Sequence, residues 1–373
     1  MKNITFTYIV IIISVLSCAK QTDEDFYPSK MLGGYKLSLI DSLIYQSTDS
    51  SFISQTHDIM FYKNYILISD YNFAKVWILS LPNENGTRNK SDKDLKLVKS
   101  LGRKGHGPQE YTYPPNIIFA NDTLFLVDSK FRSVNIYDSK FNFIKTAKLP
   151  KEIVFPGYAP IFNGNKFIFF GFKPEGFSYD ELSDIPSLFA FDSNFHLTKG
   201  FFPWDKEYEN KTAYLLDNLK VLLCNGDLND FFAKQTGTFK IVRFNKDFNK
   251  VKVFGIKPQH FKYPPDLKFE DVQKSAESAV DFTSNTTKFL KIDYDKKNAH
   301  LFINYVNLEK NFFYERTLLL GNHYLQVYNR DYNCIYDGLI PGKLAFVNDS
   351  MIYILTDERP KFIKIKVYKL IKQ

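Results

Sequence analysis

Short runs of apolar residues recur along the chain, and a tight turn rich in Asn or Gly precedes most of them. The clearest runs are 65–70, 123–128, 166–171, 299–304 and 350–357. Asn and Gly favour tight hairpins because they tolerate positive φ angles. Since the runs are rich in aromatic and β-branched residues and too short for typical helices, they are predicted to be β-strands that complete hairpins. Asn225-Gly226 marks a sixth, less regular copy.

A second hairpin follows most copies of the first. Its signature is an Asp or Asn three residues before an aromatic residue, and the four copies begin at Asp138, Asp192, Asn245 and Asn329. The Asp or Asn side chain opens the turn by hydrogen bonding to nearby backbone, and we expect the aromatic residue to start the next strand. Two hairpins make four antiparallel strands, and such units at a spacing of roughly 40 to 60 residues are typical of β-propeller blades.

The repeat predicts six blades, which begin near residues 55, 115, 158, 214, 288 and 342. The last one contains a single clear hairpin, so we expect an N-terminal strand over 35–45 to complete it and to close the ring. The predicted fold class is all-β: a six-bladed β-propeller of four-stranded antiparallel blades, closed by that N-terminal strand. A β-sandwich joined to a second β-domain is the alternative.

Two segments break the repeat and are interpreted as insertions between blades. They cover residues 204–219 and 257–288. Within the second, residues 269–280 carry the composition of a short helix, which we therefore predict there.

The composition agrees with a packed β-protein. Of the 373 residues, 17% are aromatic, 44% are hydrophobic and 24% are charged, which excludes a disordered chain, a collagen-like repeat and a coiled coil. The length alone would also suit two domains, but six blades share one closed architecture. We expect the abundant Phe and Tyr side chains to fill the space between the sheets.

The N-terminus carries an export signal. Lys2 precedes an apolar run, Ile4 to Leu16, that is too short for a good membrane-spanning helix but suits the core of a signal peptide. The run ends in Val-Leu-Ser-Cys18, which resembles a bacterial lipobox and implies lipidation of Cys18. The predicted domains are a signal peptide (1–17), a lipidated tether (18–34) and the propeller (35–373). An ordinary signal peptide with a chance Cys is the alternative.

The predicted location is the cell envelope, with a lipid anchor in the outer membrane. The acidic run at 23–25 resembles an export signal that some lipoproteins use to reach the outer leaflet, and this would expose the protein on the cell surface. A solvated linker with chance charge explains the same residues. Two Cys besides Cys18, at 224 and 334, are interpreted as buried thiols, although an exported protein permits a disulfide.

A Gly-rich motif lies between the first two blades, at 101–111. Its glycines, Gly102, Gly105 and Gly107, have the wrong spacing for either nucleotide-binding signature, and no βαβ unit surrounds them. Gly and Pro instead allow a compact crossing from one blade to the next. The motif is followed by Tyr-Pro-Pro at 113–115, and a similar crossing at 255–265 ends in the same three residues.

Residues 101–144 resemble an NHL-type repeat: a Gly-rich lead that ends in an aromatic residue, then Pro, then a strand. Val127-Asp128, Arg132 and Tyr137-Asp138 follow as in that repeat. The stretch from Gly105 to Tyr111 resembles the lead motif of six-bladed propeller lipoproteins with a TolB-like architecture. This resemblance implies a fold and a tether more than a chemistry.

Strand alternation places the crossings between blades and the central loop of each blade on one face. The candidate ligand-binding residues on that face are Arg103, Lys104, His106, Glu110, Tyr111, Lys130, Arg132 and Arg359. Cations beside aromatic rings suit an anionic or flat ligand. The alternatives are that these side chains solvate loops of a Lys-rich protein, and that Arg132 braces neighbouring blades through backbone carbonyls.

The predicted function is a binding or scaffold module. Its expected partners are the membrane, through the lipid, and an envelope protein, peptide or glycan; the mild net charge of +8 and the export signal argue against nucleic acid. No cofactor, catalytic residue or metal ligand is predicted, because no sialidase, hydrolase or metalloprotease signature occurs. A hydrolase or lyase with a metal-assisted site in the central channel is the alternative, with Asp70, Asp128 and Asp357 as turn caps or inward ligands.

Overall fold

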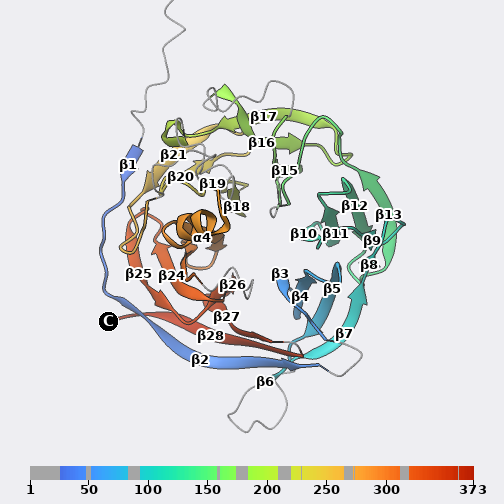
Figure 1. Cartoon of the computed structure of the whole chain (residues 1–373), viewed down its shortest axis with the longest axis horizontal. Coiled ribbons are helices and arrows are strands. Elements are labelled where there is room, and N and C mark those ends of the chain that lie inside the picture. The colour runs from blue at the N-terminus through green and yellow to red at the C-terminus, as the bar shows by residue number, and fades with distance from the viewer. Residues whose placement is uncertain are drawn as a thin grey trace, which may run out of the picture.

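The chain forms a ring of six β-sheets (Figure 1). The computed structural model describes residues 26–47, 52–82, 93–157, 160–173, 184–208, 220–227, 229–263, 272, 274–310, 319–359 and 361–373. Each sheet contains four antiparallel strands, and two of the sheets gain a short parallel strand at the outer edge. The predicted six-bladed β-propeller is therefore confirmed.

The first three blades follow one another along the chain, each from its innermost to its outermost strand. Blade 1 contains β3 (Thr56–Tyr62), β4 (Tyr65–Asp70), β5 (Lys75–Ser80) and β7 (Lys96–Leu101). Blade 2 contains β10 (Asn116–Ala120), β11 (Thr123–Asp128), β12 (Ser133–Tyr137) and β13 (Phe143–Lys148). Blade 3 contains β14 (Ile161–Asn163), β15 (Lys166–Phe170), β16 (Pro186–Phe191) and β17 (Leu197–Pro203).

The remaining blades complete the ring. Blade 4 contains β18 (Val221–Asn225), β19 (Phe231–Gln235), β20 (Ile241–Phe244) and β21 (Lys250–Gly255). Blade 5 contains β22 (Thr287–Asp295), β23 (His300–Leu308), β24 (Gly321–Tyr328) and β25 (Cys334–Ile340). Blade 6 contains β26 (Lys343–Asn348), β27 (Met351–Arg359), β28 (Phe362–Lys372) and β2 (Tyr35–Gln46). The largest difference from the predicted blade starts is in blade 4, at 221 instead of 214.

The N-terminal segment closes the ring from outside. The strand β2 pairs antiparallel with β28, from Tyr35 opposite Lys372 to Gln46 opposite Phe362, as predicted. Before it, β1 (Phe26–Pro28) pairs parallel with β21 of blade 4, and Met31 bridges to Cys334 of blade 5. Residues 26–34, which the sequence assigned to the tether, thus lie against the outer edges of blades 4 and 5.

The second hairpin has one geometry in blades 2 to 5. Its first residue (Asp138, Asp192, Asn245 or Asn329) accepts backbone hydrogen bonds from the residues two and four positions later. The aromatic residue three positions later has a φ between 62° and 64°. The prediction that this residue starts the next strand is therefore wrong. A left-handed residue and a β-bulge complete the turn first, and the strand begins two residues further on.

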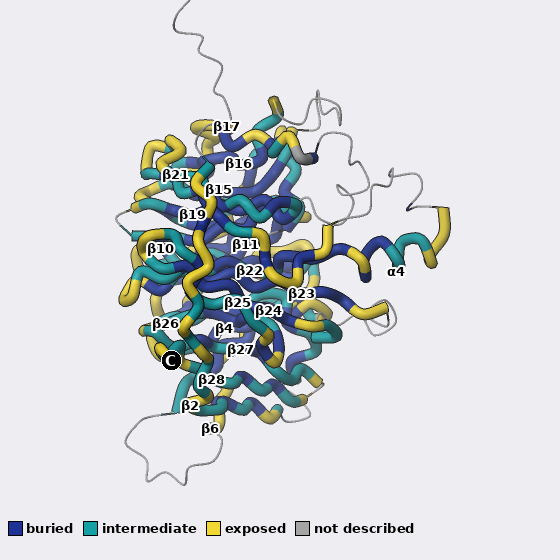
Figure 2. Tube along the Cα trace, turned by 90° about the vertical axis from the view of Figure 1, so that its left-hand side faces the viewer, coloured by how far each residue is buried: buried dark blue, intermediate teal, exposed yellow. Residues whose placement is uncertain are grey.

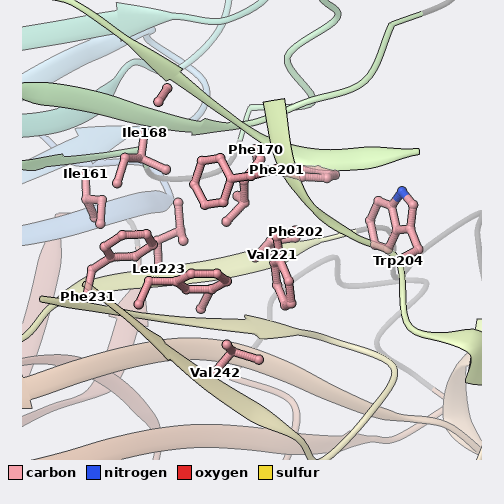
Figure 3. Packing of buried hydrophobic residues seen from close by; sticks show 14 of the residues in the cluster. Ile161, Ile168, Phe170, Phe201, Phe202, Trp204, Val221, Leu223, Phe231 and Val242 are labelled. Atoms are coloured by element: carbon pink, nitrogen blue, oxygen red, sulfur yellow. The ribbon is translucent and has the colours of Figure 1, made fainter. Parts of the chain in front are cut away.

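Aromatic and aliphatic side chains fill the six interfaces between neighbouring blades, and each interface has its own cluster. Figure 3 shows the cluster between blades 3 and 4, where Phe170 and Phe201 of one blade meet Phe231 of the next. Full burial of a large apolar side chain stabilises a fold by about 1.5 to 3 kcal/mol. The many Phe residues are therefore the packing between sheets, as predicted.

Both insertions depart from the blade pattern. A 3-10 helix, η2 (Lys206–Tyr208), lies in the first. The second contains α4 (Ala276–Ser284), which the side chain of Ser275 caps by accepting the Ser278 N–H. Of the helix predicted at 269–280, residues 276–280 lie in α4 and Val272 is also helical, whereas residues 269–271 and 273 lie outside the described residues. The helix α4 continues beyond the predicted end, to Ser284. None of the described helices is long and apolar enough to cross a membrane.

Cys224 and Cys334 are both free, buried thiols in the cluster between blades 4 and 5. Burial raises the pKa of the Cys334 thiol to about 12, so it stays protonated. The interpretation as two buried thiols is confirmed.

Candidate functional site

One face of the ring contains the loops in which most of the predicted ligand-binding residues lie. We call it the crossing face: it holds the crossings from the outermost strand of one blade to the innermost strand of the next, and the loops between second and third strands. Both kinds of loop lie there because strand direction alternates across each blade. Figure 2 shows α4, part of the crossing into blade 5, standing away from the ring on this side.

The Gly-rich motif folds as a self-contained clasp on the crossing face. Its two short strands, β8 (Arg103–Lys104) and β9 (Glu110–Tyr111), pair in parallel. The Arg103 Nε lies 2.7 Å from Oε1 of Glu110, and the backbone N–H of Gly107 donates to Oε2 at 2.8 Å. These hydrogen bonds, first the one from Gly107 and then the one from Arg103, lower the pKa of Glu110. Glu110 therefore acts as the internal acceptor of the clasp.

Tyr111 lies in the core between blades 1 and 2 and is fully buried. Its hydroxyl is 3.1 Å from that of Tyr137. Gly102 is required beside it, because a Cβ on Gly102 would lie 2.1 Å from the Tyr111 ring and the φ there is +78°. A ligand on the crossing face can contact the clasp but cannot reach the buried side chain of Tyr111. Tyr111 is therefore not a candidate ligand contact.

The exposed candidate His106 contacts an aromatic ring in the loop between the second and third strands of blade 2. The His106 ring meets the Phe131 ring edge-on, with centroids 5.4 Å apart, and the ammonium of Lys148 lies 4.2 Å from the same Phe131 ring. Lys104 is exposed in the clasp, and Lys130 is exposed directly before Phe131. The structure thus brings Lys104, His106 and Lys130 into one region at the crossing between blades 1 and 2.

Two further candidates occupy other positions. Arg359 ends β27 in blade 6, where its guanidinium pairs with Asp357 at 2.6 Å and lies 5.0 Å from the Phe362 ring. Arg132 has a φ of +51°, and its carbonyl accepts the N–H of Leu149. Within the described residues its guanidinium makes no hydrogen bond, so the predicted bracing of blades is not observed. Cys18, the predicted lipidation site, lies outside the described residues.

Asp70 and Asp128 are turn caps that tie each crossing to its blade. Asp70 accepts the N–H and hydroxyl of Ser54, the N–H of Phe73 and the indole N–H of Trp77. Asp128 holds Thr112 in the equivalent way, again sixteen residues earlier. Both carboxylates are fully buried. Of the two interpretations of Asp70 and Asp128, turn caps or inward ligands, the turn caps are therefore confirmed.

A second group of ionisable residues, which sequence analysis did not single out, surrounds the crossing-face end of the central channel. We call it the channel cluster, and its members are His57, Asp58, Lys220, Lys291, Lys343 and Glu358. They come from blades 1, 4, 5 and 6, on or next to innermost strands, except for Glu358 near the end of β27. All six side chains are partly accessible, and burial shifts the pKa values of His57, Lys343 and Glu358.

The lysines of the channel cluster differ in their partners. The ammonium of Lys291 donates to the Ile59 carbonyl at 2.9 Å and lies 3.9 Å from Asp58. Glu358 accepts the backbone N–H of Thr56. Within the described part of the chain, Lys343 has no carboxylate at ion-pair distance. The cluster therefore contains a cation without a direct counter-charge.

Burial shifts the pKa values of three members. Burial lowers the pKa of His57 to about 4, against the opposing effect of Asp58, so the imidazole is neutral at pH 7. Burial also lowers the pKa of Lys343, with Glu358 opposing and Lys291 and Lys220 adding to the effect. The pKa of Glu358 is raised by its own burial. Three titratable groups with shifted pKa values in one channel are typical of a functional site.

Aromatic rings border the channel cluster on the side of blades 1 and 2. The rings of Tyr71 and Tyr113 meet edge-on with centroids 5.7 Å apart, and both lie next to His57, at 6.4 and 5.6 Å. The His57 Nε2 is 3.4 Å from Oδ1 of Asn116. Tyr71 is exposed, so its ring is accessible to a ligand on the crossing face.

The sequence carries a signal for this cluster that the repeat analysis did not use. The apolar innermost strands are interrupted by charged residues, in Thr-His57-Asp, Lys-Ile-Asp at 291–293 and Lys343-Leu-Ala-Phe. A charged side chain on a strand next to the ring axis costs free energy unless it is paired or solvated. Such residues are therefore candidates for a functional site. Among the described residues, no group of three or more His, Cys, Asp or Glu side chains is arranged to hold a metal ion.

The comparisons with known proteins concern the fold. No family model and no curated protein matches the sequence. Among solved structures, a member of the DUF4221 family from Bacteroides vulgatus has a TM-score of 0.65 at 12% identity, covering 91% of this chain and 99% of that one. A presumed exported protein from Bacteroides fragilis has a TM-score of 0.58 at 13% identity, covering 93% and 99%. The NHL-type and TolB-like resemblance of 101–144 stays a prediction.

Proposed function

We propose that this protein is an exported, lipid-anchored binding module whose propeller captures a carboxylate-bearing ligand at the crossing-face end of its channel. The observation that carries the proposal is Lys343, a densely surrounded ammonium without a carboxylate at ion-pair distance in the described residues. A buried charge is costly unless it is paired. A ligand carboxylate would supply that pair.

The neighbours of Lys343 favour the same ligand. Lys220 and Lys291 lower its pKa and so add to the positive potential, while Asp58 already lies near Lys291. His57 is neutral at pH 7, so its imidazole can both donate a hydrogen bond to a ligand hydroxyl group and accept one from it. The exposed Tyr71 ring offers a surface for the apolar side of such a ring, as in many sugar and peptide sites. An acidic glycan is therefore the ligand class we favour over a peptide carboxylate.

The predicted rim residues form an outer layer of this site. Arg103 and Lys104 are exposed on the crossing face, at the same blade 1 to blade 2 crossing as Tyr113. Long-range attraction by exposed lysines and arginines raises association rates and weakens with salt. We expect these two residues to change the rate of capture and Lys343 to change the rate of release.

A ligand panel tests the proposal. The probes are galacturonate oligomers and C-terminal tripeptides, with their neutral analogues as controls, and the readout is the melting temperature. Acidic probes should raise the melting temperature of the wild-type protein, because a ligand that binds the folded state stabilises it. Lys343→Met should abolish the rise, and Lys145→Met, on an exposed lysine of blade 2, should keep it. Equal rises with neutral analogues, or no rise with any acidic probe, would overturn the proposal.

The lipid anchor determines how the ring lies on the membrane. Seven residues, 19 to 25, separate Cys18 from Phe26, the first residue of β1 on the rim of blade 4. The eight steps from one Cα to the next span at most about 28 Å when fully extended. The rim of blade 4 therefore stays near the bilayer and leaves the crossing face open to solutes.

The anchor is tested by labelling cells with a radioactive or alkyne-bearing palmitate. The wild-type protein should take up label and sediment with membranes, and Cys18→Ala should do neither. Uptake of label by the Cys18→Ala protein would contradict the proposal that Cys18 carries the lipid.

An enzyme is the second candidate, because burial lowers the pKa of His57 and raises the pKa of Glu358, so that a neutral imidazole and a carboxyl group with a raised pKa belong to one cluster. Turnover of a bound acidic oligosaccharide by the wild-type protein, lost in His57→Gln, would establish this candidate. Intact oligosaccharide after prolonged incubation with saturating protein would exclude it for that ligand.

A further inference from the structure

A separate recess opens on the crossing face of blade 5, beside α4, and we call it the α4 recess. Its volume is about 520 Å³, within the range of small-molecule sites. The buried residues Asn307, Leu308 and Tyr324 are among those that line it, and His260 and Asn322 are exposed lining residues. Figures 1 and 2 together place α4 above this face, over blades 4 and 5. The recess shares no residue with the channel cluster.

A column of stacked rings forms one side of the α4 recess. The His260 ring stacks on the Tyr324 ring at 4.4 Å with an interplanar angle of 20°. Tyr324 in turn stacks on Tyr305 at 5.0 Å and 15°. The hydroxyl of Tyr305 donates to Asp337 at 2.8 Å, which fixes the innermost ring. His260 is the exposed end of the column and offers a flat surface to a ligand.

Hydrogen bonds hold this surface in place without any ligand. The Asn307 side chain donates to the His260 carbonyl at 2.9 Å, and its oxygen accepts the Thr287 hydroxyl at 2.6 Å. The Lys262 N–H donates to the same Thr287 hydroxyl at 2.7 Å. The Lys262 ammonium donates to the Ser284 carbonyl at the end of α4, at 3.2 Å. A site that is ordered in advance loses less conformational entropy when it binds.

The charges around the α4 recess nearly cancel, unlike those of the channel cluster. Lys310 is paired with Asp281 at 2.6 Å, and both side chains are exposed. That leaves Lys262 and Glu309, of opposite sign, among the lining residues. The amides of Asn285 and Asn322 add both donors and acceptors. The recess therefore suits a ligand that is polar and uncharged.

We propose that the α4 recess binds a neutral saccharide, with the apolar face of one sugar ring stacked on His260. Lys262 and the Asn amides donate to its hydroxyl oxygens, and Glu309 accepts from its hydroxyl groups. An aromatic ring next to mixed donors and acceptors matches the two chemically different sides of a sugar ring. The protein then holds a glycan at two places, an acidic unit in the channel and a neutral unit in the recess.

Calorimetric titration with neutral oligosaccharides tests the proposal. The probes are cellohexaose, mannohexaose and xylohexaose, each used up to millimolar concentration. At least one should bind, and His260→Ala should weaken that binding tenfold or more. His260→Phe should retain it, because the flat ring remains. Since the His260 side chain is exposed, both variants should melt at the wild-type temperature.

Two controls separate this site from the channel cluster. Lys343→Met should leave neutral oligosaccharide binding unchanged, and His196→Ala, on an exposed histidine of the blade 3 hairpin, should do the same. Absence of heat with all three probes would overturn the saccharide proposal, and so would wild-type affinity in His260→Ala. Loss of trigalacturonate binding in His260→Ala would also overturn it, because the recess would then be an anion site.

Discussion

At the residue scale, we expect Asp70 to contribute more to the stability of the fold than any exposed ion pair on the crossing face does. Its carboxylate accepts hydrogen bonds from a crossing (Ser54), a loop (Asn72 and Phe73) and the neighbouring strand (Trp77). Removal of a buried acceptor leaves its donors unpaired, which costs more than the hydrogen bonds themselves contribute.

Asp70→Ala should therefore lower the free energy of unfolding by about 3 kcal/mol or more. Urea denaturation followed by tryptophan fluorescence measures this directly. The matched control is Asp357→Ala, in which the lost partner is the exposed Arg359, and it should cost less than about 1 kcal/mol. Equal costs for the two variants would contradict the role assigned to Asp70.

His57 makes stability depend on pH in a defined window. Its pKa is about 4 in the folded protein and 6.5 in an exposed chain, so the unfolded state binds more protons between these values. Stability attributable to His57 is complete above pH 6.5 and falls as the pH drops toward 4. The full loss is about 2 to 3 kcal/mol, with allowance for the partly accessible ring.

The comparison is between wild type and His57→Gln, by chemical denaturation at several pH values from 7 down to 4. The neighbouring Asp58 and Lys343 remain in both proteins, so the difference isolates His57. The variant should lose less stability on acidification than the wild type. Parallel curves would show that the imidazole titrates normally.

Residue roles were predictable from sequence where a local turn determines them. Asp138 and its three equivalents follow from a four-residue pattern. The position of Asp70 and Asp128 at the ends of second strands predicted either turn caps or inward ligands, and their hydrogen bonds decide for caps. Tyr111 was misplaced because an aromatic residue in a loop motif looks the same whether it covers a ligand or fills a core. The neighbouring strand β12, which supplies Tyr137, decides between the two.

At the element scale, a β-bulge between Leu39 and Asp41 divides the strand β2, so that side chains before it pack toward blade 5 and side chains after it pack toward blade 1. Leu43 is 3% exposed and packs between blades 6 and 1, whereas Leu39 on the same strand is 54% exposed. β2 is the outermost strand of its blade and pairs along nearly all of β28. Ring closure therefore depends on the inward residues of one N-terminal strand.

Leu43→Ala should lower the free energy of unfolding by about 2 to 4 kcal/mol, and Leu39→Ala by less than about 0.5 kcal/mol. Calorimetric unfolding of both variants tests this. If Leu39→Ala proves as costly as Leu43→Ala, the exposure that the bulged pairing of β2 with β28 gives the Leu39 side chain is wrong.

The elements themselves were largely predictable, because each blade repeats the same two turns. The helix predicted in the second insertion covers both the helical Val272 and the first part of α4, and the composition gave no sign that Ser275, an extended residue, caps a separate helix there. The first strand of blade 4 was also placed too early, because the preceding insertion has no repeat of its own. Periodicity locates an element, and a capping side chain determines where it begins.

At the scale of the whole molecule, ring closure brings distant residues together. Thr56 and Glu358 are 302 positions apart in the chain and share a hydrogen bond. The channel cluster was invisible to motif analysis for this reason: Lys343 and His57 belong to the last and first blades, and no local spacing connects them. The channel cluster contains three lysines and two carboxylates, so its charge has the same sign as the net charge of the chain, +8.

The most direct test of the account is the dissociation constant of trigalacturonate, measured by calorimetry for wild type and Lys343→Met under the same salt conditions. The account predicts binding by the wild-type protein and a loss of tenfold or more in the variant, since an ion pair with a partly buried cation contributes more than an ion pair fully exposed to water. Lys145→Met should bind as the wild type does. Equal dissociation constants for wild type and Lys343→Met would contradict the central claim.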